Sequence, residues 1–170
     1  NIGNAQLVLG IGLVFAFGVF IVAGFTSPFG FSLATLFPQG RMFPEIGFVK
    51  NAGVLLKTIA LIYAAYVGFE VIADDAEEVK NPAKNIPIAI LVSLAFITLV
   101  YSLVVVVTLG TLPWQQVAGS ATALSDAISV FMPGVGVTII AMAGMVGALT
   151  SINSSMLSAT RETFTLSRDG

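Results

Sequence analysis

Four long apolar stretches with almost no charged residues constrain the fold of this sequence more than any other feature. A helix rises about 1.5 Å per residue, so about 20 apolar residues cross a hydrocarbon core about 30 Å thick. The stretches that pass this test are 5–25, 54–73, 86–112 and 135–166. The sequence therefore predicts an all-α membrane protein with four transmembrane helices, and residues 1–170 read as a single partial transmembrane domain.

The segments between these stretches carry further structural signals. Asn85 stands where the N-cap of the third helix is expected, with Pro87 in the first helical turn and Pro113 after the helix end. Residues 29–53 contain Pro and Gly without a clear period and predict a loop. Apolar residues recur at helical spacing over 122–131, which predicts a short amphipathic helix lying along the surface.

Composition excludes several classes of function. Only 9% of the residues are charged, against about 25% in soluble domains, so the expected surroundings are a lipid bilayer. Seven Lys and Arg against nine Asp and Glu give no basic face for nucleic acid. The absence of Cys and His removes disulfides, thiolate or imidazole metal sites and a Ser–His catalytic pair. We expect neither an enzyme nor a bound cofactor.

The charged residues indicate how the helices are oriented. Cytoplasmic connections carry the excess of Lys and Arg in membrane proteins. If four helices cross the membrane, one side of the membrane holds Lys80, Lys84, Arg161 and Arg168. The other side then holds Arg41, Lys50 and Lys57. This bias predicts that both ends lie in the cytoplasm, with the fourth helix leaving the membrane from Arg161. The apolar opening lacks the basic start of a signal peptide, so we expect it to lie inside a longer membrane protein.

Glu70 is the deepest charged residue in the predicted membrane segments. A carboxylate at that depth costs about 2.5–3.5 kcal/mol and usually faces a cavity or a partner. Gly68 precedes it and lets the backbone leave helical geometry at little steric cost. This pairing predicts a functional interruption of the second helix. The alternative is structural: Glu70 ties helices together by hydrogen bonds, and Gly68 allows close packing.

A second polar surface lies on the fourth helix. Ser151, Ser154, Ser155 and Ser158 fall within an arc of about 100°, and Glu162 continues it. Hydroxyls in this arrangement can line a polar cavity. They can equally bond only to carbonyls of the preceding turn or to a neighbouring helix. The residues leave both interpretations open.

Two segments resemble a known transporter family. Residues 66–90 read YVGFEVIADDAEEVKNPAKNIPIAI, which resembles the signature of the amino acid–polyamine–organocation (APC) family. There, Gly-Phe-Glu breaks the sixth transmembrane helix and the Lys-Asn-Pro region leads into the seventh. Residues 153–170, NSSMLSATRETFTLSRDG, resemble the family's eighth helix and the turn that follows. The resemblance implies helices five to eight of a five-plus-five inverted-repeat fold with a discontinuous second helix.

The resemblance also implies a function and a site. It implies secondary transport of amino acids or polyamines across the plasma (inner) membrane by alternating access, as symport or antiport, together with the remaining helices of the parent transporter. The substrate-binding positions it implies are Ala64, Val67, Gly68, Phe69, Ser151 and Ser155. Glu70 would support the helix break or take part in proton coupling. Some proton-coupled members carry a Lys in helix five, and residues 5–25 contain none. The alternative is a non-transporting scaffold or receptor-like module of the same fold.

Overall fold

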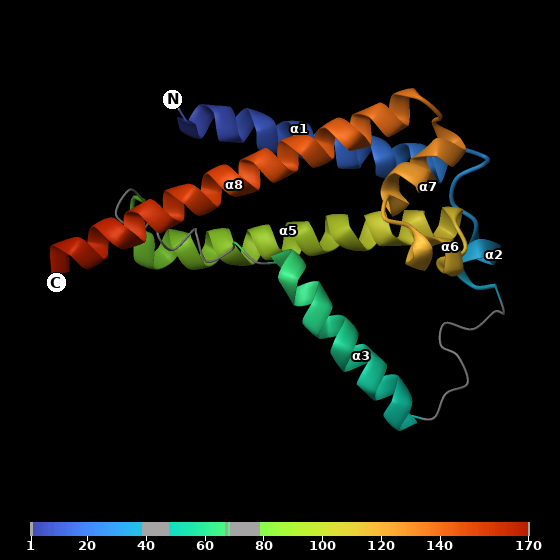
Figure 1. The fold of residues 1–170 in the computed structure, drawn as a ribbon, viewed down its shortest axis with the longest axis horizontal. Coiled ribbons are helices and arrows are strands. Elements are labelled where there is room, and N and C mark those ends of the chain that lie inside the picture. Colours follow the sequence, from blue (N-terminus) through green and yellow to red (C-terminus); the bar gives the residue numbers. More distant parts are fainter. Residues whose placement is uncertain (1, 39–47, 67, 69–78, 170) are drawn as a thin grey trace. The chain divides into compact units, whose positions relative to one another are not determined.

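A computed structural model describes residues 2–38, 48–66, 68 and 79–169. Every regular element in these ranges is a helix (Figure 1). The elements are α1 (Ile2–Thr26), α2 (Leu33–Leu36), α3 (Phe48–Tyr63), the 3₁₀-helix η1 (Ala64–Tyr66), α5 (Pro82–Thr111), α6 (Trp114–Gly119), α7 (Ala123–Phe131) and α8 (Val135–Asp169). The all-α class predicted from the apolar stretches is confirmed for this part of the chain.

Three of these helices are long and apolar enough to cross a membrane. Within the described residues the qualifying segments are Ala5–Thr26, Pro82–Thr111 and Val135–Phe164. The predicted second span, 54–73, corresponds to α3 and η1, whose apolar part, Ala52–Tyr66, is shorter. The remainder of that span falls largely outside the described residues. The predicted second transmembrane helix therefore stays a prediction.

The start of α5 differs from the predicted one. The helix begins at Pro82, so the expectation that Asn85 is its N-cap is wrong. Asn81 has a positive φ of 52°, and Pro82 then takes the first helical position, where a fixed φ and a missing N–H are both tolerated. The Asn85 side chain donates a hydrogen bond back to the carbonyl of Lys80. Pro87 consequently lies inside the helix, where it removes one backbone hydrogen bond.

The chain divides into two compact units. Unit 1 comprises Asn1–Gly40 and Leu99–Asn153, and unit 2 comprises Arg41–Thr98 and Ser154–Gly170. The helices α5 and α8 each contribute one segment to both units. The hydrophobic core with fully buried side chains belongs to unit 1, while α3 and η1 belong to unit 2.

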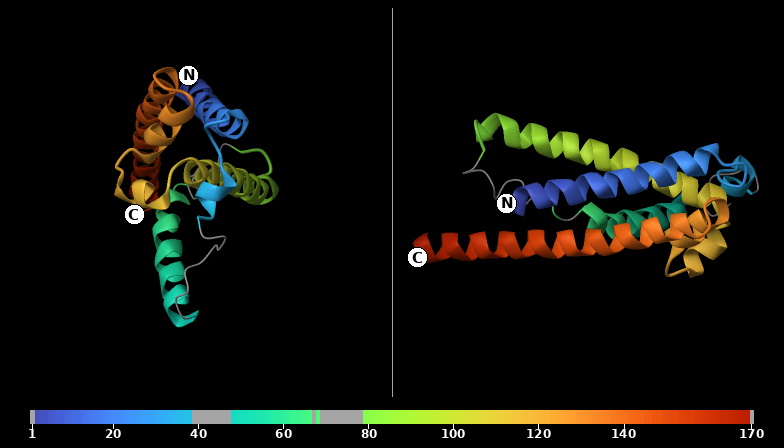
Figure 2. Two further views of the ribbon diagram at one scale, coloured as in Figure 1. Left: turned by 90° about the vertical axis from the view of Figure 1, so that its right-hand side faces the viewer. Right: turned by 90° about the horizontal axis from the view of Figure 1, so that it is seen from above.

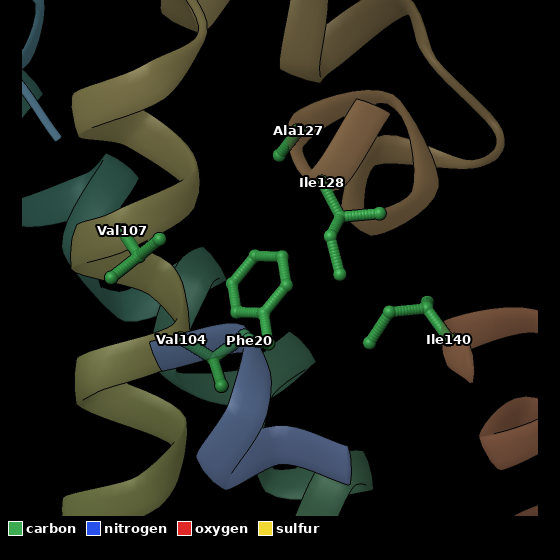
Figure 3. Packing of buried hydrophobic residues seen from close by; sticks show 6 residues of the cluster. All are labelled: Phe20, Val104, Val107, Ala127, Ile128 and Ile140. Carbon is green, nitrogen blue, oxygen red and sulfur yellow. The ribbon is translucent and has the colours of Figure 1, made fainter. Parts of the chain in front are cut away.

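The core of unit 1 surrounds Phe20 of α1, whose side chain is 0% exposed. Figure 3 shows the ring between Val104 and Val107 of α5, Ala127 and Ile128 of α7, and Ile140 of α8. The ring of Phe131 meets Phe20 edge-on, with 5.7 Å between the ring centroids. The apolar face of α7, which predicted a helix lying along the surface, is therefore covered by other side chains of unit 1. Figure 2 shows the C-terminal end of α1 beside α7 from two further directions.

Backbone hydrogen bonds hold the chain after α1 against the end of α5. The Phe31 N–H donates to the Gly24 carbonyl (2.8 Å), and the Ser32 N–H donates to the Gly110 carbonyl (2.9 Å). A Cβ at Gly110 would collide with the Phe31 ring, and one at Gly24 would collide with Val107. These small residues let the ends of α1 and α5 approach closely, as in many membrane helix pairs.

Replacing Phe20 tests this core. We expect Phe20→Ala to lower the free energy of unfolding by about 3 kcal/mol, because it leaves a cavity among packed side chains. Titration of the protein in detergent micelles with sodium dodecyl sulfate would measure the change. Phe15→Ala is the control: Phe15 lies on the same helix but is 70% exposed, so its loss should cost less than about 0.5 kcal/mol. Equal effects of the two substitutions would contradict the proposed core.

Candidate functional site

The backbone leaves α-helical geometry between Tyr63 and Gly68. The α-helix of α3 ends at Tyr63, and Ala64–Tyr66 form one 3₁₀ turn. Gly68 has a φ of +112°, which a right-handed helix does not contain and which L residues with a Cβ rarely adopt. The described part of the second predicted helix therefore ends before Phe69 and Glu70.

Local preference does not explain why the helix ends here. Ala64 and Ala65 are the strongest helix formers, so these two positions favour continuing α3. Gly68 permits the departure but does not enforce one, because Gly also occurs inside helices at a modest cost. A tertiary contact exists at this point: the Tyr66 hydroxyl donates to Oγ1 of Thr98 on α5 at 3.1 Å. The geometry of the helix end thus depends on more than its own residues.

The predicted site residues fall into two groups along the chain. Ala64 and Gly68 lie together after the end of α3, and both are exposed. A Cβ at Gly68 would meet no atom within 4 Å. Val67, Phe69 and Glu70 lie outside the described residues. The other group, Ser151 and Ser155, lies on α8.

The serines of α8 share one helix face because α8 is continuous from Val135 to Asp169. Ser151 and Ser155 are exposed and stand one turn apart, whereas Ser154 and Ser158 are half-buried. Each of these four residues already takes part in a polar interaction. The face therefore presents hydroxyl groups over about two turns. Both interpretations of the serines, cavity wall and helix tie, remain compatible with this geometry.

Sequence reasoning did not single out Thr98. The signal for Thr98 was a hydroxyl inside an apolar stretch, and Ser93 and Ser102 give the same signal in the same helix. Only the fold identifies Thr98 as the residue that meets η1. Among the described residues, no group of three His, Cys, Asp or Glu side chains is arranged to hold a metal ion.

The long apolar helices define an integral membrane protein. After the shorter apolar helix α3, its backbone departs from α-helical geometry, with a positive φ at Gly68. The sequence profile described as amino acid permease matches residues 1–170. The chain belongs to the amino acid permease family, as its resemblance to APC transporters indicated. This family is described as one of permeases and not of enzymes.

Individual relatives agree with this assignment. A methylthioribose transporter of Bacillus subtilis is 36% identical over 122 residues, which are 69% of this chain and 25% of that protein. A branched-chain amino acid permease of the same organism is 33% identical over the same shares of both chains. An uncharacterized protein of Methanocaldococcus jannaschii is 26% identical over 99% of this chain and 37% of its own length. The chain thus spans between a quarter and somewhat over a third of these relatives.

Gly68→Ala tests the backbone geometry at the candidate site. A Cβ at φ +112° costs about 1–3 kcal/mol, so we expect the substitution to lower the free energy of unfolding by that amount. Gly53→Ala is the matched control, because Gly53 lies inside α3 with open space around it and should gain up to about 1 kcal/mol. Sodium dodecyl sulfate titration of both variants would measure the difference. If Gly68→Ala stabilised the protein as Gly53→Ala does, the left-handed geometry would be contradicted.

Proposed function

We propose that this chain supplies helices five to eight of a secondary transporter that moves amino acids or related amines across the membrane by alternating access. One observation carries the proposal: directly after an apolar α-helix, Ala64–Tyr66 form a 3₁₀ turn and Gly68 has a positive φ. Non-helical backbone at membrane depth is tolerated only where protein or a water-filled cavity surrounds it. Family membership supplies the second support.

The chemistry of such a segment suits an amino acid. Where a helix is interrupted, backbone N–H and C=O groups lose their helical partners and can bind a substrate carboxylate or ammonium group. We assign this role to Ala64, Val67, Gly68 and Phe69. Ala64 carries a small side chain and would leave room for the substrate side chain.

Two further elements complete the proposed site. Ser151 and Ser155 would contribute hydroxyls from α8, whose polar face extends over about two turns. Glu70 would hold the interrupted backbone by accepting hydrogen bonds, or would couple transport to protons. Its position two residues after the left-handed Gly68 supports either role. No cofactor is required, because the binding groups are backbone amides, carbonyls and hydroxyls.

The proposed setting is the plasma (inner) membrane, with both ends of this chain in the cytoplasm. The remaining helices of the transporter would complete a five-plus-five inverted repeat and supply the opposite wall of the site. Two relatives are named for methylthioribose and for branched-chain amino acids. The substrate panel to be tested should therefore include sugars bearing a thioether as well as amino acids and polyamines.

Uptake by the full-length protein in proteoliposomes tests the function. We expect accumulation of at least one labelled compound from a panel of L-leucine, L-arginine, putrescine and methylthioribose. Glu70→Gln should reduce this uptake about tenfold or more, or shift its pH dependence, because the neutral amide cannot replace the carboxylate in holding the break or exchanging a proton. Glu78→Gln is the control: residues 74–78 hold four acidic side chains, a pattern that predicts a solvated helix end, so this substitution should leave uptake unchanged.

Two outcomes would contradict the proposal. Specific binding without any accumulation across the panel would favour a receptor-like or scaffolding module of the same fold. Unchanged uptake by Glu70→Gln at every pH would return Glu70 to a purely structural role.

A further inference from the structure

One pair of hydroxyl groups joins η1 to α5 within unit 2. Tyr66, the last residue of η1, donates from its hydroxyl to Oγ1 of Thr98 at 3.1 Å. Thr98 uses its own hydroxyl proton on the Leu94 carbonyl, one turn earlier in α5, at 2.7 Å. A threonine hydroxyl has a single proton, so Tyr66 is the donor of the bond between the two elements. The bond therefore has a fixed direction, from η1 to α5.

The two partners differ in how firmly their own elements hold them. Thr98 lies inside the 30-residue helix α5, and its bond to Leu94 fixes the orientation of its hydroxyl. Tyr66 lies in a single 3₁₀ turn of three residues, which has weak hydrogen-bond geometry of its own. The rigid partner therefore orients the weak one, and the position of η1 depends on α5.

The location of Tyr66 gives this contact a consequence for the site. Tyr66 comes two residues before Gly68, whose left-handed φ sets the direction in which the chain continues. A shift of the Tyr66 ring would be passed on to Gly68 through only one intervening residue. The contact thus controls the start of the segment to which the proposed function assigns substrate binding.

We infer that Tyr66 and Thr98 are a positioning pair, in which the Tyr66–Thr98 hydrogen bond fixes the end of η1 and Gly68 against α5. The inference rests on the proposed function for its effect on transport. Its geometric part, that this hydrogen bond fixes the end of η1 against α5, does not depend on the proposed function. Neither side chain needs to touch the substrate: the pair acts through the backbone that binds it.

The same elements provide matched controls. Tyr63 ends α3 one turn before Tyr66, is 65% exposed, and its hydroxyl meets no partner among the described residues. Thr58 donates to the Val54 carbonyl at 2.9 Å as Thr98 does to Leu94, but within the described part of the chain its hydroxyl makes no hydrogen bond to a second helix. Tyr63→Phe and Thr58→Val therefore remove the same atoms without removing a contact between elements.

Cysteine reactivity tests the geometric part. The chain contains no Cys, so Ala65→Cys places a single reporter beside Tyr66 in a full-length protein from which cysteines elsewhere have been removed. We expect Tyr66→Phe and Thr98→Val each to raise the rate of reaction with N-ethylmaleimide about threefold, and the double variant to add nothing further. Rates that stay unchanged, or that rise equally in the two controls, would overturn the pairing.

Transport kinetics test the consequence for the site. With the panel compound that the unaltered protein accumulates, we expect each variant to raise KM about threefold, and at most about fifteenfold, with a smaller change in maximal rate. The double variant should match the single ones, and both controls should match the unaltered protein. If the unaltered protein transports and Tyr66→Phe, Thr98→Val and the double variant all keep its KM, the positioning role is overturned. If the unaltered protein transports nothing, the proposed function fails, and the cysteine rates still decide whether the pair exists.

Discussion

The hydrogen bonding of the backbone is the constraint on which this structure depends. In hydrocarbon no water is available for an exposed N–H or C=O, so a segment that crosses the membrane has to satisfy these groups internally. The helices α1, α5 and α8 meet this requirement over most of their lengths, except where Pro87 inside α5 has no N–H to donate. The end of α3 does not, because the chain passes into a 3₁₀ turn and then a left-handed Gly68. A departure of this kind needs compensating partners, and the proposed ones are side chains and a bound substrate.

The two units place different demands on their side chains. In unit 1, helix ends packed around Phe20 leave little free space, and close contacts at Gly24 and Gly110 fix their approach. In unit 2, the described side chains of α3 are largely exposed, and a hydrogen bond between the hydroxyls of Tyr66 and Thr98 joins η1 to α5. The exposed apolar side chains of α3 suit lipid or the further helices that the proposed transporter would supply.

The sequence predicted the long helices well and their contacts poorly. About 20 uncharged apolar residues form a local signal, so 5–25, 86–112 and 135–166 located α1, α5 and α8 within a few residues at most ends. The start of α5 was misplaced because Asn85 and Pro82 both carry helix-start signals, and the positive φ of Asn81 is not readable from residue type.

Contacts between residues far apart in the chain could not be predicted from the sequence pattern. Periodicity showed that α7 has an apolar face but not that Phe20 and its neighbours cover it. The Tyr66–Thr98 bond joins residues 32 positions apart, and several hydroxyls in α5 were equivalent candidates. The site residues came from a motif, which names Ala64, Gly68, Ser151 and Ser155 but gives no distances among them.

A structure of the full-length protein in lipid nanodiscs tests the interruption of this helix most directly. It should show the α-helix ending by Tyr66 with a left-handed Gly68, whereas unbroken backbone hydrogen bonds from Ile59 to Glu77 would contradict it.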